Sequence, residues 1–264
     1  MEKQVVILCG GKGTRLREHT EEIPKPLVEV GGMPILWHIM KGYARHGFTD
    51  FVLCLGYKGE KIKDFFMNFE YRKMGDLTIE KGKVTMSGKT VPGNDLADWR
   101  ITFAETGPET HTGGRVKKIQ KYIHANTFFV TYGDGLSNIN FSDQLKYHLQ
   151  HGKTATMTCV KPRNPFGVVE VDARKHVRSY VEKPRMSQWV NGGFFVFERK
   201  IFRAIRDNDV LEKEPLEKLS RNGQLMAYEF DGFWTCMDTY KDTQMLNDLW
   251  KKGHAPWKSW KDSK

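Results

Sequence analysis

Residues 5–26 read VVILCGGKGTRLREHTEEIPKP. The apolar run at 5–8 is typical of a buried strand, and it leads directly into the glycine-rich, basic segment 10–15. Glycines let backbone N–H groups approach an anion closely, and neighbouring cations neutralise its charge. Lys25 follows ten residues after Arg15, held between two prolines. The stretch therefore predicts a phosphate-binding loop at the end of a strand.

The form of this loop excludes two common nucleotide motifs. No Lys-Ser/Thr pair closes it, so it is not a Walker A loop. Leu16 stands where a dinucleotide fingerprint requires its third glycine. An ordinary glycine turn beside two surface cations is the alternative for a loose GxG pattern. The complete pattern with its placed Lys25 makes that alternative the weaker one.

Length and composition indicate a globular α/β protein. The chain has 264 residues, 39% of them apolar, and 16 phenylalanines, which is enough for a sizeable core. No repeat, low-complexity linker or charge shift divides it. We therefore expect one domain over residues 1–264, with an insertion at 72–100 and a C-terminal helix and tail at 239–264.

Compartment and partners follow from the same composition. No apolar run approaches the roughly 18 residues of a transmembrane helix, and the N-terminus shows no signal-peptide pattern. The cysteines are far apart and form no CxxC pair, which indicates buried thiols and disfavours zinc. We expect a cytoplasmic protein with no membrane partner.

The net charge of +10 raises the possibility of nucleic-acid binding. The lysines, however, are spread over the whole chain, and the only dense basic cluster is the C-terminal tail. No RRM, KH, zinc-finger or helix-turn-helix pattern is present. A solvated basic surface that serves small anionic substrates is favoured, and no nucleic-acid partner is expected.

Strand-like and helix-like segments alternate along the chain, which predicts a mostly parallel sheet flanked by helices. Residues 72–100 differ, since they are polar and glycine-rich and predict a small antiparallel excursion. The expected strands are 5–8, 51–55, 127–131, 155–160, 168–171, 177–181, 191–197 and 225–230. The expected helices are 35–46, 60–69, 116–123, 141–151 and 239–250.

Two isolated carboxylates are candidates for holding a divalent cation. Asp134 follows the strand 127–131 in a YGDG motif, where open α/β sheets bind ligands. Asp238 precedes the last helix. If the fold brings them together, they can hold Mg²⁺ with nucleotide phosphates. A turn aspartate and a helix N-cap are the respective structural alternatives.

A second group of motifs is suited to a sugar phosphate. Lys183 precedes a proline, repeating the arrangement at Lys25. Gly167 and Asn191 each stand beside a predicted strand, where a sugar ring can approach the backbone or an amide. Residues 112–115, TGGR, precede a predicted helix and offer N–H groups and an arginine to an anion. Tight turns and a strand-end lysine are the alternatives.

The order of these motifs resembles the sugar-1-phosphate nucleotidyltransferase family. The matching segments are 8–16, 23–40, 47–59, 112–115, 132–135, 166–170, 182–184, 191–197 and 233–239. Within the family, segments 36–41, 112–115, 191–194 and 253–260 are similar to the branch that transfers a cytidylyl group from CTP to α-D-glucose 1-phosphate. That branch supplies CDP-glucose for CDP-hexose, deoxysugar and surface-polysaccharide synthesis.

The resemblance implies the nucleotide-diphospho-sugar transferase fold, a Mg²⁺ cofactor and a role for each motif. The implied catalytic residues are Arg15, Lys25, Asp134 and Lys183. The implied nucleotide contacts are Leu8, Gly10, Gly11, Gly13, Thr14, Arg15, Lys25, Thr106, Gly114 and Arg115. The implied sugar-phosphate contacts are Tyr132, Gly167, Glu182, Lys183 and Asn191, and the implied metal ligands are Asp134 and Asp238. The family branch also implies a homo-oligomer, a hexamer or another multimer.

Two alternatives remain open at this stage. The first is a nucleotidyltransferase that uses another nucleotide or another acceptor phosphate, with residues 105–115 deciding the base and 166–194 the acceptor. The second is a catalytically silent nucleotide-sugar sensor on the same fold. A sensor has no need to keep Lys25, Asp134, Lys183 and Asp238 together, which disfavours it.

Overall fold

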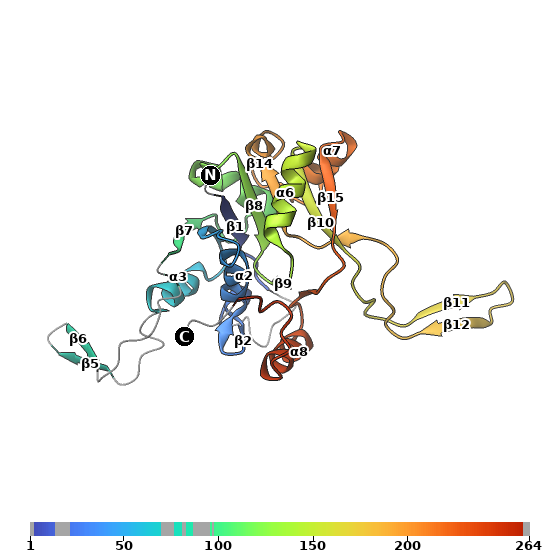
Figure 1. Cartoon of the computed structure of the whole chain (residues 1–264), viewed down its shortest axis with the longest axis horizontal. Coiled ribbons are helices and arrows are strands. Elements are labelled where there is room, and N and C mark those ends of the chain that lie inside the picture. The colour runs from blue at the N-terminus through green and yellow to red at the C-terminus, as the bar shows by residue number, and fades with distance from the viewer. Residues whose placement is uncertain are drawn as a thin grey trace.

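A computed structural model describes residues 3–13, 22–69, 77–80, 83–86, 96 and 98–260, without the side chains of 77–86. Its centre is an eight-stranded sheet in the order β13-β10-β14-β8-β1-β4-β7, with β15 paired to β10 (Figure 1). These strands are β1 Gln4–Leu8, β4 Asp50–Leu55, β7 Arg100–Glu105, β8 Thr127–Tyr132, β10 Ala155–Val160, β13 Val190–Asn191, β14 Phe195–Glu198 and β15 Leu225–Glu229. The predicted mostly parallel sheet is confirmed, since only β13 and β14 run against the others.

The strand order explains where a ligand can enter. From β1 the chain moves outward through β4 to β7, and it then returns to place β8 on the other side of β1. In open α/β sheets the loops diverge at such a switch point and leave a crevice at the carboxyl ends of the strands. The glycine-rich loop follows β1, and Asp134 follows β8, so both lie at this crevice.

Each face of the sheet carries its own apolar core. Along β1, Val5 and Ile7 face one cluster, and Val6 and Leu8 face the other. Alternate side chains point to opposite faces of a strand, so an unbroken apolar run is buried on both sides. The first face is covered by α2 Ile35–Ala44, α3 Gly59–Met67, α6 Phe141–His151 and α8 Tyr240–Lys251. The second face is covered by α5 Thr112–Lys118, η3 Ile119–Tyr122, η4 Arg199–Arg203 and α7 Glu214–Arg221.

Most expected elements are found within a residue or two, and three differ. The helix expected at 116–123 begins at Thr112, so TGGR forms its first turn, and it ends as the 3₁₀ turn η3. The strand expected at 191–197 is broken into β13 and β14, because Gly193 and Phe194 take positive φ angles of 72° and 47° between them. Strand β7 was missed, since polar residues on an edge strand obscure its apolar pattern. Within the described ranges, no helix is both long and apolar enough to cross a bilayer.

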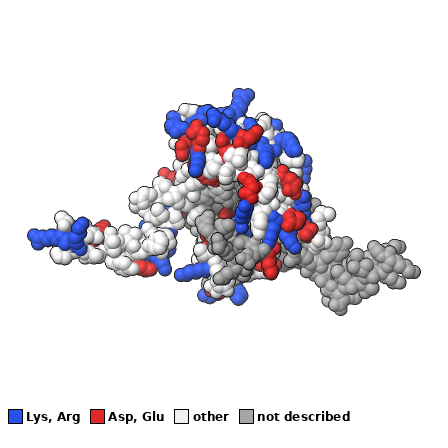
Figure 2. Space-filling model, turned by 180° about the vertical axis from the view of Figure 1, so that it is seen from behind, with Lys and Arg blue, Asp and Glu red and all other residues white. Residues whose placement is uncertain are grey.

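Four small two-stranded sheets surround the body. They are β2 Glu29–Val30 with β3 Met33–Pro34, β5 Leu77–Glu80 with β6 Lys83–Met86, β9 Gly135–Ser137 with β16 Trp234–Cys236, and β11 Val168–Val171 with β12 Val177–Val181. The antiparallel excursion expected within 72–100 is confirmed by β5 and β6. The β11–β12 hairpin projects from the body as an arm (Figure 1). Figure 2 shows this arm at the left, largely uncharged along its length and basic at its tip.

His38 in α2 is buried inside an aromatic cluster formed with the C-terminal tail. Its ring makes edge contacts with Trp37, Trp250 and Trp257. Nε2 lies 2.7 Å from the carbonyl oxygen of Val30, and Nδ1 lies 3.4 Å from the indole Nε1 of Trp257. Since a carbonyl can only accept and an indole N–H can only donate, the ring is neutral with its proton on Nε2. Burial lowers the pKa of His38 from 6.5 to about 4.

This buried histidine predicts a loss of stability in mild acid. The folded-state pKa lies below the unfolded value, so the unfolded chain binds more protons between pH 6.5 and 4. The contribution of His38 is complete above pH 6.5, and we expect it to fall by about 3 kcal/mol as the pH drops to 4. Urea unfolding across this range measures it. The His38→Gln variant should show a shallower pH dependence, and the exposed control His254→Gln an unchanged one. Identical slopes for all three proteins would refute the assignment.

Candidate active site

Loops from four parallel strands meet at the crevice beside β1. Hydrogen bonds join Gly133 N to Leu8 O at 3.1 Å, Tyr57 N to Gly10 O at 3.2 Å and Thr106 N to Leu55 O at 3.0 Å. These bonds fix the segments after β8, β4 and β7 against the glycine-rich loop. The crevice therefore has a defined backbone frame on which side chains can be placed accurately.

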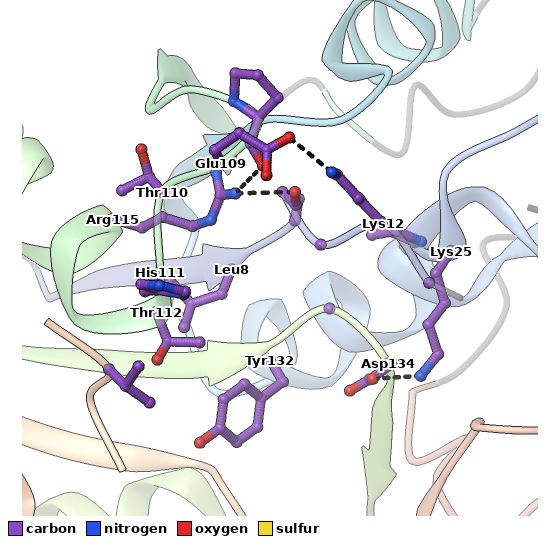
Figure 3. Close-up of a pocket in the computed structure, with 18 of the residues that line it drawn as sticks. Leu8, Lys12, Lys25, Glu109, Thr110, His111, Thr112, Arg115, Tyr132 and Asp134 are labelled. Carbon is purple, nitrogen blue, oxygen red and sulfur yellow. Dashed lines mark hydrogen bonds and ion pairs between the residues drawn. The ribbon is translucent and has the colours of Figure 1, made fainter. Parts of the chain in front are cut away.

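The frame encloses a pocket of about 490 Å³ (Figure 3). The residues that line it are Leu8, Cys9, Gly10, Gly11, Lys12, Gly13, Lys25, Pro26, Pro108, Glu109, Thr110, His111, Thr112, Arg115, Tyr132, Gly133, Asp134, Val210 and Glu212. Figure 3 shows Lys25 and Asp134 at one end and His111 and Thr112 at the other. Lys12 and Glu109 form an ion pair of 2.7 Å between the loops after β1 and β7. The pocket is large enough for a nucleotide, and it has Lys12 and Lys25 on one side and Arg115 on the other (Figure 3).

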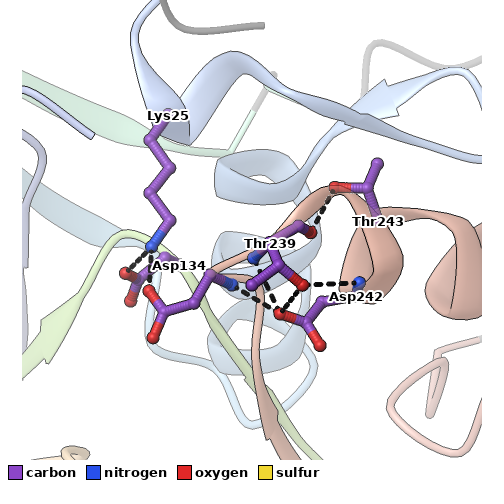
Figure 4. Close-up of polar contacts among 6 residues, drawn as sticks. Lys25, Asp134, Thr239, Asp242 and Thr243 are labelled. Atoms are coloured by element: carbon purple, nitrogen blue, oxygen red, sulfur yellow. Dashed lines mark hydrogen bonds and ion pairs between the residues drawn. The ribbon is translucent and has the colours of Figure 1, made fainter. Parts of the chain in front are cut away.

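Lys25 joins the two candidate metal ligands. Its Nζ lies 2.6 Å from Asp134 Oδ2 and 2.6 Å from Asp238 Oδ1 (Figure 4). Burial by itself lowers the pKa of Lys25, but the charge of Asp134 and the hydrogen bonds to both carboxylates outweigh it and raise the pKa above its usual value. The ammonium is therefore held fully charged between two acidic groups that come from distant parts of the chain.

Asp238 has no part in capping the last helix. The N-cap of α8 is Thr239, which forms a capping box with Asp242. The side chain of Asp242 also accepts a bond of 3.0 Å from the backbone N–H of Asp238 (Figure 4). The N-cap alternative for Asp238 is therefore wrong, and its carboxylate is directed at Lys25.

The donor atoms beside Lys25 suit a hard divalent cation. Among the described residues, Asp134, Asp238 and Cys236 offer ligand atoms that all lie within 4.8 Å of one another. Carboxylate oxygens are preferred by Mg²⁺, whereas a protonated thiol is not. Burial, followed by the charge of Asp134, raises the pKa of Cys236, which keeps it a thiol. The ammonium of Lys25 already places a positive charge between the same carboxylates.

Arg115 supports the glycine-rich loop from behind. Its guanidinium is buried and donates to Leu55 O at 3.0 Å, Thr106 Oγ1 at 2.6 Å and Gly10 O at 2.9 Å. Burial lowers its pKa, yet an arginine stays protonated at neutral pH. Its donors fix the backbone of three loops, and the residue also lines the pocket, so the nucleotide contact expected of Arg115 stays a prediction.

Two glycines are required by this arginine. A Cβ atom at Gly10 would lie 2.0 Å from Arg115 Nη1, and one at Gly56 would lie 2.5 Å from the same atom. Both distances are far below van der Waals contact, so any side chain would expel the guanidinium. The absence of a side chain at Gly10 thus leaves room for the guanidinium of Arg115 as well as for a ligand.

The other expected nucleotide contacts divide into three groups. Leu8, Gly11 and Gly13 line the pocket. Thr106 lies behind it, bonded to Leu55 O at 2.5 Å, and Gly114 packs on the backbone of Asn208, away from the pocket. Thr14 and Arg15 lie outside the described residues.

The expected sugar-phosphate residues are separated in space. Tyr132 lines the pocket, whereas Asn191 does not line it and accepts a hydrogen bond from Gly193 N. Gly167, Glu182 and Lys183 belong to the β11–β12 arm and do not line the pocket of their own chain. Lys183 pairs with Glu182 at 3.5 Å on the surface of the arm. The linear order of motifs carries no information on this separation.

One acidic pocket residue was missed from the sequence. Glu212 precedes α7 and accepts hydrogen bonds from the hydroxyl groups of Tyr132 and Thr112. It belongs to a charged surface-like segment, DNDVLEKEP, in which nothing distinguishes one carboxylate from another. Only the fold places it opposite β8.

A glycine-rich loop at the switch point of an α/β sheet, with a lysine between two carboxylates, is typical of a nucleotide-binding enzyme. The family model for nucleotidyl transferases matches residues 4–255. The chain belongs to the nucleotidyl transferase family.

Named relatives narrow the comparison. The chain is 44% identical over 261 residues to the probable glucose-1-phosphate cytidylyltransferase of Bacillus subtilis, covering 97% of this chain and 100% of the relative. It is also 44% identical to glucose-1-phosphate cytidylyltransferase of Salmonella typhi, covering 97% and 99%. The crystal structure of HddC from Yersinia pseudotuberculosis complexed with GMP-PN has a TM-score of 0.69 at 24% identity, covering 94% and 99%. The last similarity establishes the fold.

Proposed function

We propose that this chain transfers the cytidylyl group of CTP to α-D-glucose 1-phosphate and releases pyrophosphate. The relatives at 44% identity, aligned over nearly their whole length, are named for this activity. The observation that carries the proposal is the Lys25–Asp134–Asp238 cluster beside a nucleotide-sized pocket that Lys25 and Asp134 line. Four free cysteines fit the reducing cytoplasm in which such an enzyme would act.

Catalysis of this reaction requires the two substrates to be held in position more than it requires a proton to be transferred. A phosphate oxygen of the sugar phosphate forms a bond to the α-phosphorus of CTP, and the bond to the β-phosphate oxygen breaks, so pyrophosphate leaves. The nucleophile is already an anion, and no general base is required. The difficulty is to bring two polyanions together and to stabilise the charge on the leaving group. Lys25 and the N–H groups of the glycine-rich loop are placed to do this.

Mg²⁺ is the cofactor that we propose, with Asp134 and Asp238 as its protein ligands. When bound, it would neutralise and orient the phosphates of the nucleotide. Because Lys25 lies between the same two carboxylates, its ammonium is expected to move toward the nucleotide phosphates when the cation binds. Arg15, two residues after Gly13 in the sequence, is proposed to act on the leaving group.

Lys183 and Glu182 are proposed to reach the sugar phosphate of a neighbouring subunit. The arm that carries them exposes apolar side chains on both faces, with Val177 60% and Tyr180 63% exposed. A two-stranded hairpin of this kind is marginally stable alone in water, and exposed apolar surface marks a protein contact. A homo-oligomer in which each arm covers the pocket of another copy would bury these side chains and complete the site.

Subunit mixing tests the shared site. Lys25→Ala inactivates the body and Lys183→Ala the arm, and each variant alone should lose at least tenfold in turnover. Co-expressed with different tags and purified as mixed oligomers, they should recover activity, because about one quarter of randomly assembled sites combine an intact body with an intact arm. Mixing Lys25→Ala with Asp134→Ala, both body variants, is the matched control and should recover none. If neither mixture recovers activity, Lys183 acts in the site of its own subunit or has no role in catalysis.

Pyrophosphate release with α-D-glucose 1-phosphate and Mg²⁺ tests the reaction itself, with CTP, UTP, dTTP, GTP and ATP offered separately. Release with CTP well above the others is the expected result. Release with a different nucleotide would keep the mechanism and reassign the base. If no nucleotide gives pyrophosphate release, either the proposed acceptor or the proposed catalysis is refuted. Nucleotide binding measured by calorimetry would separate these two outcomes.

A further inference from the structure

A continuous hydrogen-bond chain crosses the pocket end opposite Lys25. Glu212 Oε1 accepts from the hydroxyl of Tyr132, and Oε2 accepts from Thr112 Oγ1 at 2.7 Å. The hydroxyl oxygen of Thr112 in turn accepts from the backbone N–H of Leu211 at 2.9 Å. Glu212 thus joins the last residue of β8 to the first residue of α5.

The chain ends at Tyr132, next to the expected sugar side. Gly193 packs against the ring of Tyr132, where a Cβ atom would lie 2.8 Å from Cδ2. The backbone N–H of Gly193 donates to Asn191 Oδ1 at 2.9 Å. Tyr132 therefore lies beside the turn that carries Asn191.

The direction of every bond in this chain depends on the acceptor-only character of a carboxylate. With Glu212 accepting at both oxygens, the hydroxyl groups of Tyr132 and Thr112 must both donate to it. A glutamine of the same shape carries an NH₂ group and would reverse one of these bonds. The negative charge of Glu212 also opposes the binding of phosphates in the same pocket. A carboxylate at this position therefore weakens phosphate binding, and the fixed direction of the hydrogen bonds is what it provides in return.

We propose that Glu212 is a positioning residue, which fixes the nucleotide side of the pocket relative to the sugar side through Thr112 and Tyr132. Thr112 begins the helix that carries Arg115, and Arg115 holds the carbonyl of Gly10. Tyr132 lies two residues before Asp134. Loss of the chain would loosen both ends of the reacting geometry while leaving the contacts of Lys25 in place. This inference rests on the proposed transfer reaction.

A double-mutant cycle on turnover tests it. We expect Glu212→Gln to lower kcat/KM by about ten- to a hundredfold, mostly through kcat, because misplacement of the reacting groups affects the transition state more than the ground-state phosphate contacts. Tyr132→Phe removes the hydroxyl that Glu212 orients. In that background, Glu212→Gln should cost less than about twofold, since coupled residues are not additive. The control Glu214→Gln changes an exposed carboxylate two residues away and should match the wild type.

Equal losses from Glu212→Gln in both backgrounds would overturn the proposal, as would wild-type turnover of the single variant. A role confined to folding would lower the melting temperature and leave kcat at 25 °C unchanged, which would also overturn it. If the proposed substrates are wrong, the wild-type protein itself forms no CDP-glucose, which distinguishes that failure from a failure of the role of Glu212. In that case the double-mutant cycle is repeated with the nucleotide and the acceptor that the wild-type protein does use. If the protein uses none, the cycle is measured on CTP binding by calorimetry.

Discussion

Replacing Asp134 by alanine is expected to lower turnover at least about a hundredfold, while the protein stays folded. This is the scale for removing one preorganised electrostatic contact, about 2.7 kcal/mol of transition-state stabilisation. Asp134 is one of two carboxylates that we propose for Mg²⁺, and the remaining one would hold the cation less firmly and in a less defined position. Lys25 would still pair with Asp238 at 2.6 Å, so little stability should be lost.

Pyrophosphate release measures the effect on turnover, and paramagnetic Mn²⁺ binding measures the metal site without turnover. Asp134→Ala should weaken Mn²⁺ binding at least tenfold, the scale on which losing an interaction at a metal site lowers affinity. Asp64→Ala, at an exposed position in α3, is the matched control and should leave both readouts unchanged. A folded Asp134→Ala protein with near-normal turnover would refute the metal assignment.

Replacing Lys25 by alanine is expected to have an effect of similar size for a different reason. The ammonium is the partner of both carboxylates before substrate binds, and it is proposed to stabilise the nucleotide phosphates afterwards. Its removal leaves two like charges close together and takes a cation from the leaving group. We expect turnover to fall at least about a hundredfold and the melting temperature to fall as well.

A metal titration separates the two roles of Lys25. In the wild type a divalent cation must compete with the ammonium for the carboxylates, whereas in Lys25→Ala it meets no competitor. Mg²⁺ without nucleotide should therefore raise the melting temperature of Lys25→Ala more than that of the wild type. Lys146→Ala, at an exposed position in α6, controls for the loss of one positive charge. An equal Mg²⁺ response in the two proteins would contradict a shared position for lysine and metal.

Much of the fold could be predicted because its signals are local. The unbroken apolar run at 5–8 and the 3.6-residue apolar period of the helix starting at Ile35 are visible within a short segment. Gly152 caps α6 with a positive φ angle, and Gly47 takes one three residues after the end of α2. Strand β7 was missed because polar residues obscure its apolar pattern, and the interruption at Gly193 was missed because a local turn does not alter hydrophobic periodicity.

By itself, the sequence determined the glycine-rich loop, the alternating elements and the residue types at the crevice, since backbone freedom and apolar spacing act over a few residues. Only the tertiary structure decided which distant residues meet. Lys25 bridges Asp134 and Asp238 across 109 and 213 positions of sequence, and Arg115 donates to the carbonyl of Gly10. The tertiary structure likewise places Glu212 in the pocket and Lys183 outside it. The order of strands in the sheet and the path of the arm set these distances, and both result from packing of the whole chain.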